Sequence, residues 1–91
     1  MGEKARPRPA RLAEKLLQVR LRLGLSQGQL IRMLRVDLTQ NRISDYELGK
    51  GEPSLPLILQ YAKAANVSTD ALIDDDLDLP AKLPAKVKYR P

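Results

Sequence analysis

Apolar residues recur at intervals of three and four along much of the chain, which is the spacing of helices that bury one side. The first stripe of this kind comprises Leu12, Leu16, Val19 and Leu23. Gly24 follows it directly and suits the left-handed conformation in which many helices end. Leu17 and Leu21 widen the stripe. We expect both to pack against the last helices of the fold, the alternative being a small exposed patch for a partner.

Four further helices are predicted, each beginning after a residue whose hydroxyl can cap the first turn. The predicted caps are Ser26, Thr39, Ser54 and Ser68. In the first three of these helices the residues expected to face inward are Leu30, Ile31 and Leu34, then Ile43, Tyr46 and Glu47, then Ile58, Tyr61, Ala62 and Ala65. Gly49 closes the second of the three, and Asn66 suits a left-handed exit from the third.

The composition agrees with a helical core. The only aromatic residues are Tyr46, Tyr61 and Tyr89, so the core must be built from Leu, Ile, Val and Ala, which favours packed helices over a sheet. A chain of 91 residues is long enough for one small domain. The sequence therefore predicts an all-α fold, with a single five-helix domain over residues 11–74.

The two ends of the chain differ from its middle. Residues 1–10 combine arginines and prolines with almost nothing to bury, which predicts a flexible basic arm. Residues 75–91 are rich in Pro, Lys and Ala and predict a flexible tail. Between middle and tail stand Asp74, Asp75, Asp76 and Asp78. These carboxylates invite a calcium site, but they lack the glycine and the terminal glutamate of an EF-hand loop, so we interpret them as a solvated helix stop.

The charge of the chain favours a polyanionic partner. The formal net charge is +5 and the pI is about 9.8, and residues 1–25 alone carry seven Lys or Arg against two Glu. A small basic protein usually binds a polyanion, the alternative being that the charge only maintains solubility. Since the chain contains neither Cys nor His, we expect no metal site, no cofactor and no enzymatic activity.

An ordered set of residues in the middle of the chain is its most specific signal. The set comprises Ser26, Gln27, Leu30, Leu34, Val36, Ile43, Ser44, Tyr46, Glu47, Gly49 and Pro53. Physically it is a short capped helix, a turn, and a second helix capped by Thr39. Through this set, residues 11–73 resemble the Cro and phage-repressor type of helix-turn-helix, also called the xenobiotic-response-element family. The resemblance implies a lambda-repressor-like fold that binds double-stranded DNA with its second motif helix in the major groove.

The beginning of the helix after Thr39 carries side chains that suit DNA bases. The expected base-reading residues are Gln40, Asn41, Arg42, Ser44 and Asp45. With Ile43 turned inward, the helical repeat places these residues on the outer side of the helix or at its tip. Gln40 and Asn41 can each bond both N6 and N7 of adenine. The alternative is an ordinary solvated helix face whose polar residues only cap the helix.

The remaining expected contacts concern the DNA backbone and the fold. The expected phosphate-binding residues are Ser26, Gln27, Thr39 and Lys50. The resemblance implies that the residues matching Gln27 and Lys50 hold the DNA backbone. It also implies a largely buried ion pair between the first and third helices, formed here by Arg20 and Glu47.

Two departures from the family pattern affect the turn of the motif. Six residues separate Val36 from Ile43, which makes the turn longer than usual. Arg35 stands where the family often has Gly, and Ile31 stands where it prefers a small residue such as Ala. A bulkier Ile31 would push the two helices apart, and the longer turn would accommodate that.

We expect a sequence-specific transcriptional repressor that acts by blocking polymerase. It would bind as a homodimer to a pseudo-palindrome whose half-sites lie about one helical turn, roughly 34 Å, apart. The alternative is an antitoxin-like or bridging protein whose tail, residues 79–91, folds on a protein partner. No apolar run approaches the roughly 18 residues that span a bilayer, so we expect a cytoplasmic protein without membrane contact.

Overall fold

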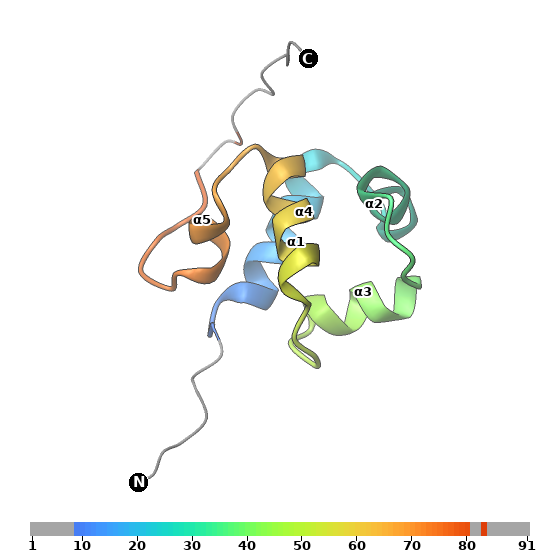
Figure 1. The fold of residues 1–91 in the computed structure, drawn as a ribbon, viewed down its shortest axis with the longest axis horizontal. Coiled ribbons are helices and arrows are strands. Elements are labelled where there is room, and N and C mark those ends of the chain that lie inside the picture. The colour runs from blue at the N-terminus through green and yellow to red at the C-terminus, as the bar shows by residue number, and fades with distance from the viewer. Residues whose placement is uncertain (1–8, 81–82, 84–91) are drawn as a thin grey trace, which may run out of the picture.

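A computed structural model describes residues 9–80 and residue 83, and within them it contains helices and no strands (Figure 1). The helices are α1 (Leu12–Leu23), α2 (Gln27–Leu34), α3 (Gln40–Glu47), α4 (Leu55–Ala65) and α5 (Thr69–Ile73). The predicted all-α fold of five helices is therefore confirmed. None of these helices combines the length and the apolar character needed to cross a membrane.

The helices begin and end at the residues whose side chains or backbone favour those positions. The Ser26 hydroxyl accepts the Gln29 N–H while the Gln29 side chain accepts the Ser26 N–H, which forms a capping box at the start of α2. Thr39, Ser54 and Ser68 cap the three following helices in the same way, without the reciprocal bond. The backbone turns left-handed at Gly24 and Asn66, as predicted.

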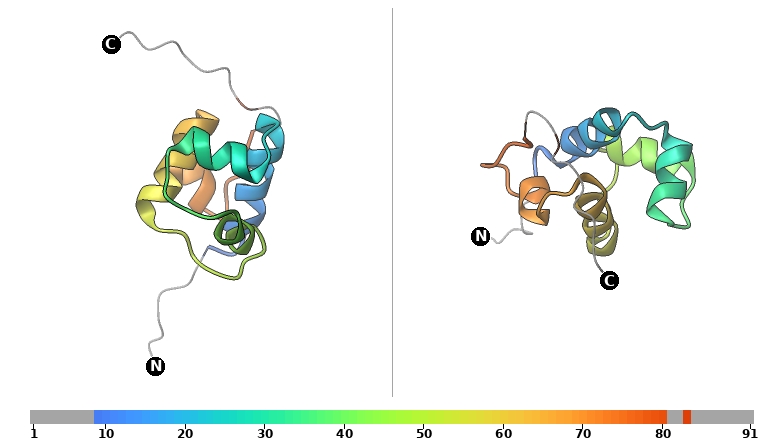
Figure 2. Two further views of the ribbon diagram at one scale, coloured as in Figure 1. Left: turned by 90° about the vertical axis from the view of Figure 1, so that its right-hand side faces the viewer. Right: turned by 90° about the horizontal axis from the view of Figure 1, so that it is seen from above.

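The core lies where α1 and α4 cross, with contributions from every helix. Its buried members are Leu12, Leu16, Val19, Leu30, Leu34, Ile43, Leu57, Ile58, Tyr61, Ala62, Ala65 and Leu72. The two helices of the motif, α2 and α3, lie on one side of α1 and α4, and α5 lies on the other side (Figures 1 and 2). Burial of this aliphatic set supplies the main stabilisation of the fold.

The expected packing of Leu21 is wrong. This residue is 53 % exposed, while Leu17 is half-buried. At about 100° per residue, Leu21 lies roughly opposite the buried Val19 on α1. Although α3, α4 and α5 all contact α1, the described helices leave Leu21 exposed.

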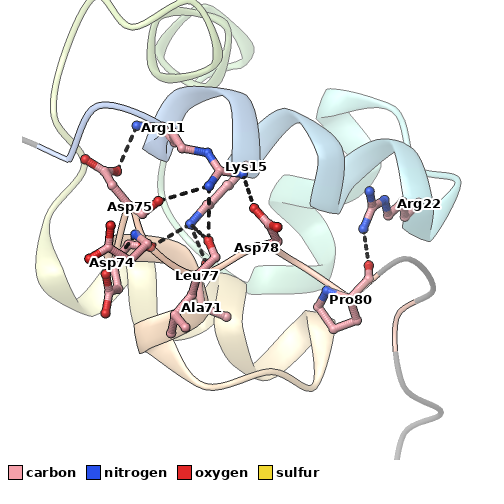
Figure 3. A network of polar contacts seen from close by, with 10 residues as sticks. Arg11, Lys15, Arg22, Ala71, Asp74, Asp75, Leu77, Asp78 and Pro80 are labelled. Carbon is pink, nitrogen blue, oxygen red and sulfur yellow. Dashed lines mark hydrogen bonds and ion pairs between the residues drawn. The ribbon is translucent and has the colours of Figure 1, made fainter.

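A segment after α5 returns along α1, and we call residues 74–80 the strap. It runs in the same direction as α1, from Arg11 at the beginning of the helix to Arg22 near its end (Figure 3). The Asp75 carboxylate accepts the backbone N–H groups of Ala10 and Arg11, at 2.8 and 3.0 Å. Arg11 in turn forms an ion pair with Asp78 at 2.7 Å. The strap thus supplies the capping carboxylate that the start of α1 lacks in its own sequence.

Lys15 fastens the middle of the strap to the core. Its side chain is buried, with the residue only 2 % exposed. The ammonium donates to the main-chain oxygens of Ala71 and Asp74, both at 2.9 Å, and of Leu77 at 2.6 Å (Figure 3). Three acceptors satisfy all three N–H groups of a lysine, which is the condition for burying such a charge.

The strap bears on two of the expectations for the end of the chain. The acidic residues 74–78 make contacts within the protein, and no group of acidic residues in the described part of the chain is arranged to hold a metal ion. The domain boundary at residue 74 stays a prediction, although residues 75–80 lie against α1. Of the predicted arm and tail, residues 1–8, 81–82 and 84–91 lie outside the described residues.

Candidate nucleic-acid interface

The first turn of α3 presents an exposed polar tip. Gln40, Asn41 and Arg42 are all exposed, whereas Ile43, the next residue, is completely buried. Thr39 caps this turn by accepting the Arg42 N–H at 3.2 Å. The burial of Ile43 turns Asn41, two residues earlier, toward solvent, whereas Gln40, three residues earlier, lies on the side of α3 next to α2. The free N–H groups at this helix end add to its attraction for anions.

Ser44 and Asp45 lie further along α3 and are half-buried. Asp45 also accepts the backbone N–H of Lys50 at its main-chain oxygen, at 2.8 Å, which shapes the loop after α3. The side chain of Lys50 in this loop is exposed. The expected base-reading residues thus fall into an exposed group of three at the tip and a less accessible group of two behind it.

The expected phosphate-binding residues have different surroundings. Ser26 and Thr39 are exposed at the starts of α2 and α3, and each hydroxyl accepts a capping bond while keeping its own proton to donate. Gln27 is half-buried, and its side-chain amide donates to Glu47 at 3.1 Å. One N–H of Gln27 is therefore directed into the protein rather than toward solvent.

The ion pair between Arg20 and Glu47 is present and joins α1 to the end of α3. Arg20 donates through Nε at 2.7 Å and through Nη2 at 3.1 Å, so the contact is bidentate. The two side chains are 15 % and 5 % exposed. The hydrogen bonds with Glu47 raise the pKa of Arg20. With Gln27 bonded to the same carboxylate, this pair fixes α3 relative to both α1 and α2.

Tyr61 lies in the core near this ion pair and interacts electrostatically with both of its members. Its side chain is fully buried, and its hydroxyl bonds to none of the described residues. Burial raises the pKa of Tyr61. The neutral phenol is thus kept over the whole physiological range of pH.

In the described part of the chain, the exposed cations without a protein partner lie on α2, α3 and α4 and in the turns that follow α2 and α3. Among the described residues, those whose side chains make no hydrogen bond or ion pair are Arg32, Arg35, Arg42, Lys50 and Lys63. Sequence reasoning did not single out Arg32 as a site residue. Arg32 lies one helical turn after Gly28 and close to Gln40 at the start of α3. The sequence could not show this closeness, because it depends on how α2 and α3 cross.

The longer turn between α2 and α3 adapts to the fold at Arg35 and Leu38. Arg35 ends α2 with a left-handed backbone, at φ 57°. Leu38 and Ile31 are half-buried and pack against the core. The turn borders an open pocket of about 590 Å³ whose other wall is formed by Tyr46 and Leu57. The extra residues are thus accommodated beside α4 without displacing the start of α3 from the surface.

A comparison with protein families finds one match, to the helix-turn-helix family, over residues 16–72. This region covers well over half of the chain and contains both motif helices, the turn and the ion pair. No match is found among the curated proteins or among the solved structures.

Proposed function

Because the chain belongs to the helix-turn-helix family, whose domains bind double-stranded DNA and regulate transcription, we propose that it recognises a specific DNA sequence and represses transcription there. The α3 helix would enter the major groove with its first turn leading. Repression would follow from occupying a promoter and blocking polymerase.

One observation carries this proposal more than any other. The tip formed by Gln40, Asn41 and Arg42 is exposed, and among the described residues Arg32 on α2 and Lys50 in the loop after α3 are exposed cations without a partner. Amides that pair with base edges and cations that neutralise phosphates are the two components of sequence-specific binding. Gln40 and Asn41 supply the amides, and Arg32, Arg42 and Lys50 supply the cations.

We assign the contacts as follows. Gln40 and Asn41 would each pair with adenine, a contact that discriminates by about 1–3 kcal/mol. Arg42 would take guanine or a phosphate. Asp45, helped by Ser44, would act as a filter that accepts a hydrogen bond from cytosine and repels other bases.

Phosphate contacts would come from both sides of the tip. The hydroxyls of Ser26 and Thr39, the Gln27 amide and the Lys50 ammonium are the expected donors. Arg32 is added to this set because it is exposed and unpaired on α2. Of these groups Gln27 needs the largest rearrangement, since it already donates to Glu47.

The proposed assembly is a homodimer in the cytoplasm. Two copies related by a two-fold axis would place two α3 helices in successive major grooves, roughly 34 Å apart. The operator would then be a pseudo-palindrome.

Selection of bound oligonucleotides from a random pool, followed by anisotropy titrations between about 50 and 200 mM salt, tests the proposal. We expect a recovered consensus sequence and an affinity that falls steeply with salt. Replacing both Gln40 and Asn41 by Ala should remove the preference for the consensus while leaving the melting temperature unchanged. The absence of any consensus, together with affinity for a protein that is insensitive to salt, would instead support the antitoxin-like or bridging alternative.

A matched pair of variants sharpens this test. Arg42→Ala should lower the slope of log affinity against log salt by about one, as expected for one lost phosphate contact, or relax the preference at one base. Lys63→Ala removes another exposed cation, on α4, and should change neither the salt dependence of binding nor the base preference. Equal effects of the two variants would show that only overall charge matters.

A further inference from the structure

Gly28 lies inside α2, where glycine is an unfavourable choice. It is the second residue of the helix, and its φ is negative, unlike that of Gly24 and Gly49. The backbone conformation at this position is therefore one that residues with a side chain also adopt. Glycine in a helix is destabilising relative to alanine, so its presence points to a need for space.

The space is taken by a side chain of α3. A Cβ atom added at Gly28 would lie 2.9 Å from Nε2 of Gln40, which is closer than real contacts of this kind. The other nearby atoms are Cδ of Gln40 at 3.8 Å and Nη1 of Arg32 at 3.9 Å. The Gln40 amide thus lies directly on the bare backbone of α2, with the Arg32 guanidinium beside it.

The identity of these neighbours separates two explanations for the glycine. A glycine that lets two helices approach closely would have backbone atoms of the other helix as its nearest neighbours. Here the three nearest atoms outside the local backbone all belong to the ends of long polar side chains, those of Gln40 and Arg32. The helices themselves do not require the missing methyl group, but the position of the Gln40 amide does.

We propose that Gly28 is a specificity-determining residue that holds the Gln40 amide in the orientation in which it reads a base. The inference rests on the proposed function, because it assigns a positioning role within the same DNA-reading surface. Gln40 alone is an exposed side chain with several rotamers. Seated on α2 between Gly28 and Arg32, it presents its amide edge in one direction, beside a cation that can hold the adjacent phosphate. A preformed orientation reduces the ordering cost of binding.

The test is Gly28→Ala, compared with Gln40→Ala and with the double variant. The added methyl group should displace the Gln40 side chain and leave α2 intact, so the melting temperature should stay the same or rise. Discrimination between the consensus base and the other bases at the position read by Gln40 should fall by about 5- to 150-fold, the range of one bidentate contact. In the Gln40→Ala background the same glycine substitution should have no further effect on discrimination.

Gly51→Ala is the matched control, since Gly51 is the other described glycine without a positive φ. A methyl group there would lie 3.5 Å from the Tyr46 ring, in ordinary contact and away from Gln40. Discrimination should be unchanged in this variant.

The outcomes distinguish this inference from the proposed function. If the unmodified protein selects no consensus, the proposed function itself fails. If it selects one, and Gly28→Ala keeps full discrimination at every position, the inference is overturned. A fall in melting temperature with discrimination intact would also overturn it, because Gly28 would then serve helix packing only.

Discussion

Arg11 at the start of α1 and Lys15 and Arg22 within it bind the strap, whereas Arg32 and Arg42 of the motif helices make no hydrogen bond or ion pair with the described residues. The two regions lie on opposite sides of the central helices (Figure 1). On the strap side every one of these cations donates to a main-chain oxygen. On the motif side the cations are left free for an external partner.

This difference shows that the basic N-terminal part of the sequence and the candidate DNA surface are not the same thing. Residues 1–25 carry a net charge of +5, equal to that of the whole chain, but four of their seven cations are bonded within the protein. These four still add to the long-range attraction of a polyanion. The N–H groups that make these bonds are not available to a phosphate.

The largest expected effect is on the contact that joins the two regions. Glu47→Ala removes the acceptor of Arg20 and Gln27 and leaves a nearly buried guanidinium without its partner. We expect the free energy of unfolding to fall by about 3–5 kcal/mol, measured by chemical denaturation. Asp37→Ala is the control: it removes an exposed carboxylate from the turn between α2 and α3 and should change the free energy of unfolding by less than about 0.5 kcal/mol. An unchanged denaturation curve for Glu47→Ala would mean that the pair is solvated in solution.

A second prediction compares one cation from each region. Lys15→Met keeps the apolar stem but removes the donor to three carbonyls, so stability should fall by about 2–4 kcal/mol. DNA affinity measured well below the melting temperature should not change. Arg42→Ala should do the reverse, weakening DNA binding at constant stability. If both variants lost stability, or both lost affinity, the division of labour between the two regions would be wrong.

The parts of the fold that were predictable from the sequence are those set by local interactions. Ser26, Thr39, Ser54 and Ser68 were assigned as caps because a hydroxyl bonds to the N–H groups two or three residues further on. The ion pair between Arg20 and Glu47 was predicted from the family resemblance, since the spacing of the two residues in the sequence does not indicate that they meet. Leu21 was misjudged because a second apolar stripe does not show whether a helix covers it.

The strap was not predictable for a different reason. Its bonds to Lys15 and Arg22 end on main-chain oxygens, which every residue possesses, so no side-chain pattern marks them. Lys15 itself stands within an apolar stripe as an ordinary charged residue of a helix. The seat of Gln40 on Gly28 was hidden in the same way, because it depends on how two helices cross.

A third prediction concerns Arg35, whose left-handed backbone ends α2 on the motif side. A side chain with a Cβ atom is strained in this conformation, and glycine is not. Arg35→Gly should therefore raise the free energy of unfolding by about 0.5–1 kcal/mol, offset in part by the greater freedom of glycine in the unfolded chain. Arg35→Ala keeps the strain and removes the charge, so it should not stabilise. A gain in both variants would point to charge repulsion rather than to the backbone.

The smallest effect should appear at Asp75, where the strap caps α1. Its bonds from the Ala10 and Arg11 N–H groups lower the pKa of the Asp75 carboxyl below its ordinary value. A group whose pKa is lower in the folded state stabilises the protein above its unfolded pKa, near 3.9, and loses that contribution as the pH falls through the folded pKa. The stability difference between the unmodified protein and Asp75→Ala should therefore be constant above about pH 5 and shrink in acid.

An NMR titration of the carboxyl groups checks the same point directly. The pKa of Asp75 should lie below the ordinary value of an aspartate. Asp76→Ala is the matched control, since the neighbouring Asp76 side chain accepts neither of these backbone bonds. Because the strap lies across the molecule from α3, neither variant should alter DNA affinity at neutral pH. A loss of affinity in Asp75→Ala alone would show that the position of Arg11 or of the chain before it reaches the DNA-binding side, and the separation of the two regions would no longer hold.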